Sequence, residues 1–406
     1  MIVIEPRIRN NVCITAHPQG CAAQVHEQVR YVKSRGELKS PARVLVIGAS
    51  NGYGLAARIV SAFGSAAATV GVAYERPGAP HRSATAGWYN SEAFQREAAG
   101  AGIPAWNING DAFTEAVKAE TVGRIKADLG QVDFVVYSIA APRRIDPETG
   151  ELYSSAIKPI GRPFTGRGID FLTGNLVEMT TEPATEEEAA HTVKVMGGED
   201  WRLWVTRLLQ EDALAGGALT IALSYIGSEM TRAIYRDGTI GRAKADLEQT
   251  AQALDAMLKP HRSRALISVN KALVTRASAV IPGVSLYTAL LYKAMKARGL
   301  HEGCIHQMDR LYRDFLFSGG EIPLDNQGRI RLDDLEMRPD VQRAVAEAWA
   351  RVTPESLTRY ADLQGFREEF LRHHGFGMPG IDYSQPVDPT TIGTCEMPQP
   401  TDFTGG

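Results

Sequence analysis

Tyr235 and Lys244 are the two residues of this chain whose types and spacing best suit hydride chemistry on a polarised double bond. When a hydride reaches one carbon of a polarised C=O or C=C, charge develops on oxygen, which a phenol can stabilise by hydrogen bonding or by donating its proton. A nearby lysine can hold the ribose hydroxyls of a nucleotide, and its charge together with a nicotinamide can lower the phenol pKa, ordinarily about 10, toward working pH. Tyr225, ten residues upstream of Tyr235, adds a second phenol.

The same spacing occurs a second time in the chain, at Tyr287 and Lys296 within "LYTALLYKAMK". This stretch has an uninterrupted helical pattern, and nine residues along a helix correspond to about 13.5 Å and about half a revolution. The two side chains should therefore face opposite ways, and we predict a packing helix rather than a site.

The segment "SEMTRAIYRDGTIGRAKADLEQ" differs because Gly238 and Gly241 lie between its tyrosine and its lysine. Glycine is a poor helix former, so this pair should break the helix. We therefore expect Tyr235 on a loop and Lys244 in the first turns of the next helix, where both can reach one ligand.

Short β-branched runs alternate with longer amphipathic stretches between residues 43 and 270, the rhythm of βαβ units on a parallel sheet. We predict an α/β fold with a doubly wound, Rossmann-like parallel sheet. The predicted helices include residues 55–63, 111–129 and 242–258. The predicted strands are "RVLVIG", "ATVGVAY", "PAWNI", "VDFVVYSIA", "ALTIALSY" and "RALISVN".

Three parts of the chain fall outside this rhythm: residues 1–42, the Pro-, Gly-, Thr- and Glu-rich residues 141–198, and residues 284–406. We expect residues 1–283 to form the nucleotide-binding core with an N-terminal extension, and residues 284–406 to be a helical extension packed on it as one compact unit. The insertion at 141–198 follows the carboxyl end of a predicted strand, where open α/β sheets bind ligands, so it could cover a site. Its "TEEEAA" predicts a solvated helix start.

A glycine-rich turn follows the first core strand, in "RVLVIGASNGYGLAARI". Gly48, Gly52 and Gly54 lie between a buried strand and an amphipathic helix, where bare backbone N–H groups and a helix N-terminus can bind a phosphate. Glycines also serve packing at tight turns, but this placement favours a cofactor pyrophosphate.

The ends of the next three strands carry further candidate contacts. A carboxylate at Glu75, after Tyr74, can accept both adenosine-ribose hydroxyls and would repel a 2′-phosphate, which favours NADH over NADPH, although Arg76 could admit a phosphate. Asp111 and Ala112 could meet the adenine, and a helix N-cap accounts for Asp111 equally well. The small residues Ile139 and Ala140 leave room for a flat ring and its ribose.

Composition excludes several other functions. A net charge of −3 with scattered Lys and Arg gives no basic face for nucleic acid. No stretch approaches the length of a membrane span, the start lacks the apolar core of a signal peptide, and the four cysteines show no paired spacing, so we expect a reduced, cytoplasmic protein with no membrane partner. In "HEGCIH", His301 and His306 are five apart, which misaligns them for zinc, and we expect no metal.

With these motifs, the chain resembles the FabV-type enoyl reductases, enlarged relatives of the short-chain dehydrogenases, over nearly its full length. The resemblance rests on the Tyr235 and Lys244 spacing, since short-chain dehydrogenases generally place these residues four apart, and on five further motifs. These are "PRIRNNVCITAHPQGC", "GASNGYG", "YSIAAPRR", "VKVMGGEDW" and "HEGCIHQM".

The resemblance implies a role for each candidate residue. Tyr235 is the implied proton donor, Lys244 holds the nicotinamide ribose, and Tyr225 contacts the thioester carbonyl of the substrate. The implied cofactor contacts are Gly48, Ala49, Ser50, Asn51, Gly52 and Tyr53 for the pyrophosphate, Tyr74 and Glu75 for the adenosine ribose, Asp111 and Ala112 for the adenine, Ile139 and Ala140 for the nicotinamide side, and Leu273, Val274 and Thr275 for the carboxamide.

The implied reaction is hydride transfer from NADH to C3 of a trans-2-enoyl thioester, followed by protonation at C2, which gives the saturated acyl thioester of the fatty acid elongation cycle. The carrier is acyl carrier protein or coenzyme A, and the family implies a monomer. Two other readings stay open: a carbonyl (3-ketoacyl) reductase of the short-chain dehydrogenase type, and a non-catalytic NADH-sensing protein. Spacing alone does not decide which tyrosine donates the proton.

Overall fold

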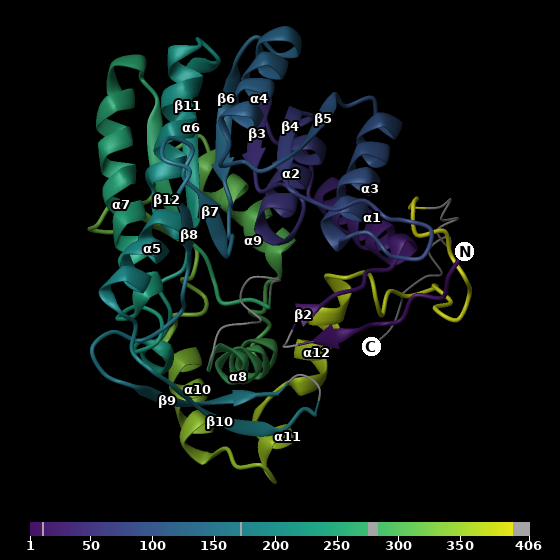
Figure 1. Cartoon of the computed structure of the whole chain (residues 1–406), viewed down its shortest axis with the longest axis vertical. Coiled ribbons are helices and arrows are strands. Elements are labelled where there is room, and N and C mark those ends of the chain that lie inside the picture. Colours follow the sequence, from purple (N-terminus) through teal and green to yellow (C-terminus); the bar gives the residue numbers. More distant parts are fainter. Residues whose placement is uncertain (10–11, 171–172, 275–282, 393–406) are drawn as a thin grey trace.

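The computed structural model describes residues 1–9, 12–170, 173–274 and 283–392. Its centre is a seven-stranded sheet in the order β13-β12-β11-β6-β3-β4-β5, in which every neighbouring pair is parallel (Figure 1). The strands are β3 (Arg43–Ile47), β4 (Ala68–Ala73), β5 (Ala105–Asn109), β6 (Val132–Tyr137), β11 (Leu214–Ser224), β12 (Arg264–Val269) and β13 (Arg329–Arg331).

The first six of these strands confirm the prediction, and so does the doubly wound order, because the chain runs from β3 outward to β5 and then returns to place β6 on the other side of β3. The edge strand β13 was not predicted. It has only three residues, two of them arginine, so it carries no apolar run from which a strand could be read.

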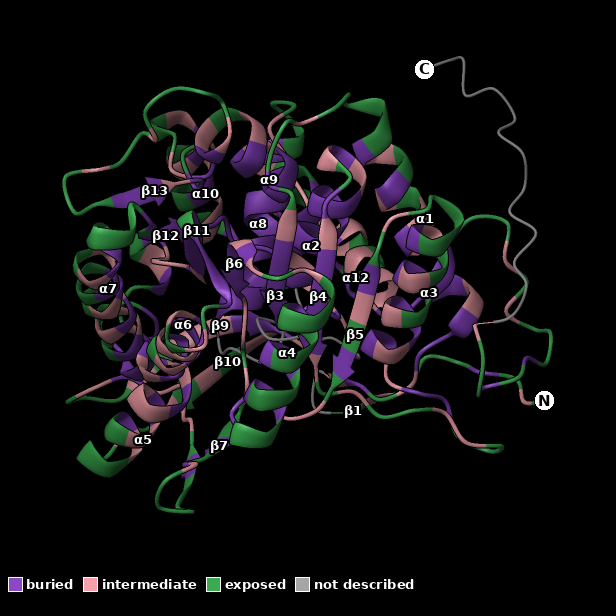
Figure 2. Ribbon diagram, turned by 90° about the horizontal axis from the view of Figure 1, so that it is seen from above, coloured by how far each residue is buried: buried purple, intermediate pink, exposed green. Residues whose placement is uncertain are grey.

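Helices cover both faces of the sheet, and the strands between them are buried (Figure 2). One face packs against α1 (Pro18–Ser34), α2 (Gly52–Ser65), α3 (Ala86–Gly100) and α9 (Cys304–Arg310). The other packs against α4 (Glu115–Asp128), α6 (Glu199–Gln210) and α7 (Thr239–Leu258). The three predicted helices are thus present, as α2, α4 and α7.

The insertion at 141–198 contains two antiparallel hairpins and one helix. The hairpins are β7 (Arg143–Ile145) with β8 (Leu152–Ser154), and β9 (Phe164–Ile169) with β10 (Leu176–Thr181). The helix α5 (Glu186–Met196) begins in the predicted "TEEEAA", where Thr185 and Glu188 form a capping box. The β9–β10 hairpin lies beside α8 (Val284–Lys296), and the Ile169 N–H donates to the Ser285 hydroxyl over 2.9 Å (Figure 1).

The remaining elements form a second layer below the sheet in Figure 1. They are mainly α8, which is the uninterrupted helix predicted around Tyr287, with α10 (Pro339–Arg351), α11 (Leu357–Tyr360) and α12 (Leu363–Arg372). Short elements complete the chain: β1 (Ile8–Arg9), β2 (Val12–Cys13), η1 (Glu229–Thr231), η2 (Lys259–His261) and η4 (Leu311–Leu316). Across the part of the chain that is described, no helix combines the length and the apolarity that a membrane crossing requires.

Candidate active site

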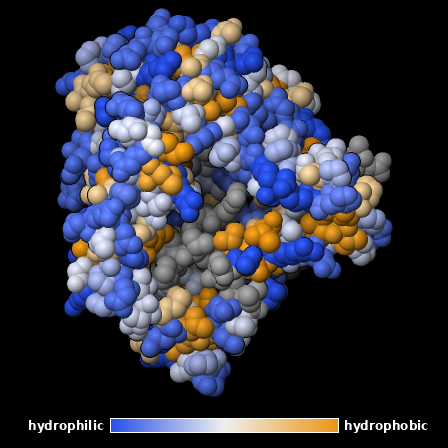
Figure 3. All heavy atoms as spheres, viewed as in Figure 1, coloured by the Kyte–Doolittle hydropathy of each residue, from blue (hydrophilic) through white to orange (hydrophobic). Residues whose placement is uncertain are grey.

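The site lies where the strand order reverses, at the carboxyl ends of β3 and β6. A Cβ on Gly48 would lie 2.3 Å from the Ser138 carbonyl oxygen, so glycine is what allows these two strand ends to approach. Open α/β sheets bind ligands in the crevice at such a switch point. Figure 3 shows a hollow on this face of the molecule, between the sheet and the layer that contains α8, with apolar patches on its rim.

The predicted phosphate cradle is formed by the turn from β3 into α2. Gly48 has φ +91° and Gly52 has φ +53°, values that favour glycine, and a Cβ on Gly54 would lie 1.9 Å from the Gly48 carbonyl oxygen. Asn51 occupies the N-cap of α2, yet its side chain makes no capping hydrogen bond. The first N–H groups of this 14-residue helix therefore lack a side-chain cap and can bind an anion.

The side chains of Ser50 and Asn51 are directed to Glu75 at the end of β4. The Ser50 hydroxyl donates to Oε1 of Glu75 over 2.8 Å, and Nδ2 of Asn51 donates to the same oxygen over 3.2 Å. The structure thus ties the carboxylate expected at the adenosine ribose to the cradle expected at the pyrophosphate. Tyr74, expected at the same ribose, has a side chain that is 77% exposed. Ala49, by contrast, is buried in the core.

Asp111 and Ala112 lie in the turn between β5 and α4. The helix N-cap is Thr114, whose hydroxyl accepts from the Val117 N–H, so the N-cap reading of Asp111 is wrong. Asp111 instead accepts from the Phe113 N–H over 3.0 Å within the turn. Buried Lys118 holds this turn from the side of the core.

Lys118 is almost completely buried and joins this turn to the core. Its ammonium donates to the Ala112 and Phe113 carbonyl oxygens over 3.0 and 2.9 Å, and to Oδ1 of Asp200 over 2.8 Å. The Tyr137 hydroxyl donates to the other Asp200 oxygen over 3.1 Å. Burial raises the pKa of Asp200, which the Lys118 cation opposes. A buried ion pair thus fixes the loop on which the adenine contacts were expected.

Tyr53 was expected to contact the pyrophosphate, but its side chain is hydrogen-bonded within the protein. Its hydroxyl lies 2.9 Å from both the Lys271 carbonyl oxygen and Oε1 of Gln307, and the Lys271 N–H donates to Oε1 of Gln307 over 3.1 Å. The Tyr53 side chain therefore links the cradle to the segment that follows β12. Gln307 belongs to the "HEGCIHQM" motif and was not predicted as a site residue.

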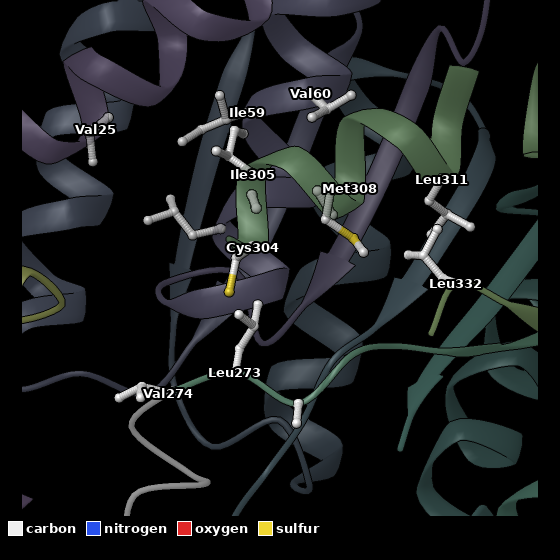
Figure 4. Packing of buried hydrophobic residues seen from close by; sticks show 14 of the residues in the cluster. Val25, Ile59, Val60, Leu273, Val274, Cys304, Ile305, Met308, Leu311 and Leu332 are labelled. Atoms are coloured by element: carbon white, nitrogen blue, oxygen red, sulfur yellow. The ribbon is translucent and has the colours of Figure 1, made fainter. Parts of the chain in front are cut away.

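That segment contains Leu273 and Val274, whose side chains are buried; Thr275 lies outside the described residues. Figure 4 shows Leu273 directed toward Cys304 of α9. The Val274 N–H donates to the Tyr292 hydroxyl over 3.0 Å, and the Val274 carbonyl oxygen lies 2.7 Å from Nε2 of His373. The backbone of Val274 is therefore already fully hydrogen-bonded within the protein.

Tyr235 and Lys244 occupy the predicted loop and helix. Gly238 is the N-cap of α7, and Lys244 lies in the second turn of that helix. Gly241 does not break the helix, contrary to expectation, since it lies inside α7. Its role is steric: a Cβ there would lie 1.8 Å from the Arg236 carbonyl oxygen, so only glycine lets the tyrosine loop pack against the first turn.

Tyr225 and Tyr235 meet below the carboxyl end of β11. Their ring centroids are 4.8 Å apart with an interplanar angle of 76°. The Tyr225 hydroxyl donates to Oε1 of Glu336 over 3.3 Å, and the Tyr287 hydroxyl donates to the same oxygen over 2.6 Å. Tyr287 was predicted only to pack; it does pack in the core, but its hydroxyl joins the Tyr225 network. Glu336 was not predicted at all, because one acid among several in "RLDDLEMRPD" gives no signal of burial.

The ionisation of the two central residues follows from burial. Burial raises the pKa of Tyr235 well above its ordinary value, so the phenol stays protonated in the protein by itself. The lowering of this pKa by Lys244 together with nicotinamide stays a prediction. Burial lowers the pKa of Lys244 to about 8, with Glu248 opposing the shift. Neither the Tyr235 hydroxyl nor the Lys244 ammonium makes a hydrogen bond or ion pair with any described residue, so both can serve a ligand.

Buried polar side chains at the carboxyl ends of β11 and β12 indicate whether a cofactor fits this site. Among the described residues, both polar atoms of the Asn270 side chain, which follows β12, and the Ser224 hydroxyl, which ends β11, are buried without a hydrogen-bond partner. Leaving such groups unpaired is costly, and a hydroxyl- and amide-rich ligand would satisfy them. With the cradle, Glu75 and Lys244, they form a donor and acceptor set that fits a nicotinamide dinucleotide.

Ile139 and Ala140 follow the carboxyl end of β6; Ile139 is half-buried against the core and Ala140 is exposed.

The described ranges contain no group of three His, Cys, Asp or Glu side chains that could hold a metal ion. The His301 ring instead packs edge-on against Tyr292, with centroids 4.4 Å apart.

Together, a doubly wound sheet, a glycine cradle at its switch point and a Tyr–Lys pair beside the crevice define a nicotinamide-dependent oxidoreductase. A family model described as "Trans-2-enoyl-CoA reductase catalytic region" matches residues 82–317, and one described as "NAD(P)H binding domain of trans-2-enoyl-CoA reductase" matches residues 3–80. The chain belongs to the trans-2-enoyl-CoA reductase family.

Individual relatives match nearly the full length of the chain. The enoyl-[acyl-carrier-protein] reductase [NADH] of Opitutus terrae is 56% identical over 389 residues, covering 96% of this chain and 99% of the relative. A structure of Clostridium acetobutulicum trans-2-enoyl-CoA reductase in complex with NADH is 44% identical, with a TM-score of 0.94 over 96% of this chain and 98% of that one. The Treponema denticola trans-2-enoyl-CoA reductase in complex with NAD is 48% identical, with a TM-score of 0.93 over 98% and 100%.

A third family model, described as "Enoyl reductase FAD binding domain", matches residues 324–387. In the described part of this segment, Val341, Val345, Phe366 and Phe370 are buried in the same core as α8. These side chains therefore serve the packing of the core.

Proposed function

We propose that this chain reduces the trans-2 double bond of enoyl thioesters with NADH, and that Tyr235 donates the proton. The observation that carries the assignment is the difference between the two phenols. Tyr225 donates to Glu336, whereas the Tyr235 hydroxyl is buried, protonated and without a partner among the described residues. A proton donor must hold its proton until charge develops on the substrate, and Tyr235 meets this requirement.

Bound NADH supplies the hydride, which goes to C3 of the enoyl thioester, and the proton goes to C2. Lys244 would hold the nicotinamide ribose and so aim the reacting carbon. Tyr225 would hydrogen-bond the thioester carbonyl oxygen, which gains charge as the hydride arrives. Its bond to Glu336 is 3.3 Å long, beyond the usual range for hydroxyl donors, so a closer carbonyl acceptor can compete for it.

The cofactor contacts are part of the same proposal. Residues 48–53 would bind the pyrophosphate, with Tyr53 contributing its backbone because its hydroxyl is engaged with Lys271 and Gln307. Tyr74 and Glu75 would bind the adenosine ribose, which favours NADH. Asp111 and Ala112 would meet the adenine, Ile139 and Ala140 the nicotinamide side, and residues 273–275 the carboxamide.

The proposal extends to the whole molecule as a cytoplasmic monomer. Residues 1–283 would be the NADH-binding core and residues 284–406 an extension that works with it as one unit. The pairing of β13 with β12 and the packing of α9 on α2 support one unit, since the extension completes the central sheet. Relatives named for acyl carrier protein and for CoA support an enoyl thioester on either carrier.

The test is to mix the purified protein with NADH and crotonyl-CoA, follow absorbance and identify the product by mass spectrometry. The proposal predicts one saturated thioester for each NADH oxidised, and little oxidation with acetoacetyl-CoA. Oxidation with acetoacetyl-CoA in place of crotonyl-CoA would instead establish a carbonyl reductase. NADH binding without turnover of either thioester would establish a sensing protein.

A further inference from the structure

Glu336 is the most deeply placed acid near the candidate site, with 0% of its surface exposed. It comes from the turn after β13, the strand that the C-terminal part of the chain adds to the sheet. Gln342 fixes its backbone, because the Gln342 amide donates to the Glu336 carbonyl oxygen over 2.8 Å. A carboxylate held in this way, far along the chain from both phenols, is well suited to orient other groups.

Three donors converge on this one carboxylate. Oε1 accepts from the Tyr287 hydroxyl over 2.6 Å and from the Tyr225 hydroxyl over 3.3 Å, and Oε2 accepts from the Ala272 N–H over 2.7 Å. The three donors come from α8, from the end of β11 and from the segment after β12. Glu336 therefore joins the phenol expected at the substrate to the residue directly before Leu273, where the carboxamide contacts were expected.

The hydrogen bonds from the Tyr287 and Tyr225 hydroxyls to Glu336 differ in length, and this difference separates their roles. The Tyr287 bond is short and anchors the carboxylate, whereas the Tyr225 bond is long enough to be exchanged for a substrate oxygen. Tyr225 also packs edge-on against Tyr235, so its ring is fixed on one side and its hydroxyl on the other.

We infer that Glu336 is a positioning residue for thioester reduction, which holds the Tyr225 hydroxyl where a substrate carbonyl oxygen can take over its hydrogen bond. The inference rests on the proposed function. It assigns to the C-terminal part of the chain a direct part in building the substrate side of the site. The groups that face Glu336 with a charge or a titratable proton are Tyr225, Tyr287, Lys271 and Asp333.

The variant Glu336→Gln tests this, because one amide oxygen cannot accept from three donors on two sides. We expect kcat/KM for crotonyl-CoA to fall about tenfold or more, since a hydrogen bond lost from a buried network costs on this scale. The affinity for NADH, measured by fluorescence titration, should change by less than about threefold. The matched control is Asp334→Asn, an acid of the same turn whose exposed carboxylate accepts from Arg310, and it should leave both values unchanged.

A double-mutant cycle with Tyr225→Phe distinguishes action of Glu336 through the Tyr225 hydroxyl from a purely structural role of Glu336. If Glu336 acts through the Tyr225 hydroxyl, the Glu336→Gln change should lower kcat/KM by less than about twofold in the Tyr225→Phe background. Equal losses in both backgrounds would overturn the inference, as would a Glu336→Gln enzyme with wild-type thioester kinetics. Should Glu336→Gln fail to fold, Glu336→Asp, which keeps the charge and shortens the reach, must show the same non-additive loss. Failure of the wild-type enzyme to reduce crotonyl-CoA would contradict the proposed function itself.

Discussion

The rings of Tyr225 and Tyr235 lie edge to face, 4.8 Å between centroids, and only Tyr225 has its hydroxyl bonded to a described residue. Two phenols of similar intrinsic acidity are thereby made different. One is tied through Glu336 to the C-terminal part of the chain, and the other keeps its proton for a ligand. This difference supports separate roles in carbonyl binding and proton donation.

Cofactor affinity should depend on pH through Lys244. Its pKa is lowered to about 8, so the ammonium that would hold the ribose is lost as pH rises through that value. Fluorescence titration with NADH from about pH 6.5 to about pH 9.5 should show affinity falling above about pH 8. Lys244→Arg, which stays charged over this range, should remove the pH dependence. An unchanged alkaline decline in Lys244→Arg would assign it to another group.

Cofactor preference should depend on the charge of Glu75. Glu75→Gln can still accept from Ser50 while removing the repulsion toward a 2′-phosphate. We expect kcat/KM with NADPH to rise about tenfold, equivalent to roughly 1.4 kcal/mol, with NADH little changed. Glu211→Gln is the control, because Glu211 precedes the amino end of β11, away from the carboxyl ends of the strands that form the site. A Glu75→Gln enzyme that still discriminates as strongly as wild type would show that the charge is not the discriminator.

The tyrosine loop should not tolerate a side chain at position 241. Gly241→Ala places a Cβ where the Arg236 carbonyl oxygen now lies, so the loop must move. A displacement of about 1 Å at reacting groups can cost about 100-fold in rate, and we expect crotonyl-CoA turnover to fall by roughly 10- to 100-fold. Gly123→Ala, inside α4 with open space around it, should keep activity and gain about 0.5–1 kcal/mol of stability. Equal turnover in both variants would contradict the steric role.

Stability should depend strongly on the buried Lys118–Asp200 pair. Lys118→Met leaves the Asp200 carboxylate buried without its cation, which should cost about 3–5 kcal/mol of unfolding free energy. Urea denaturation measures this. Lys126, on the same helix, pairs with Glu211 only at the surface over 3.9 Å, so Lys126→Met should cost less than about 1 kcal/mol. Similar midpoints for the two variants would exclude a supporting role for the pair.

The sequence predicted most of the nucleotide-binding core because its strands are continuous apolar runs and its turns carry glycine. The local pattern also predicted that Tyr235 precedes a helix bearing Lys244. It could not predict β13, which is held by its pairing with β12 rather than by an apolar pattern. For the same reason it missed Glu336, whose burial depends on that strand, and it assigned Tyr287 to packing alone. Gly241 was identified as important but for the wrong reason, because its contact with Arg236 is set by the fold of the loop.

Proton donation by Tyr235 is tested by comparing Tyr235→Phe with Tyr225→Phe in crotonyl-CoA reduction, with NADH affinity measured for both. We expect Tyr235→Phe to keep NADH affinity within about threefold and to lose at least about 100-fold in kcat, the scale of a missing general acid. Tyr225→Phe should mainly raise KM for the thioester and keep kcat within about tenfold. Near wild-type turnover in Tyr235→Phe, or the larger loss of kcat in Tyr225→Phe, would show that Tyr235 is not the proton donor.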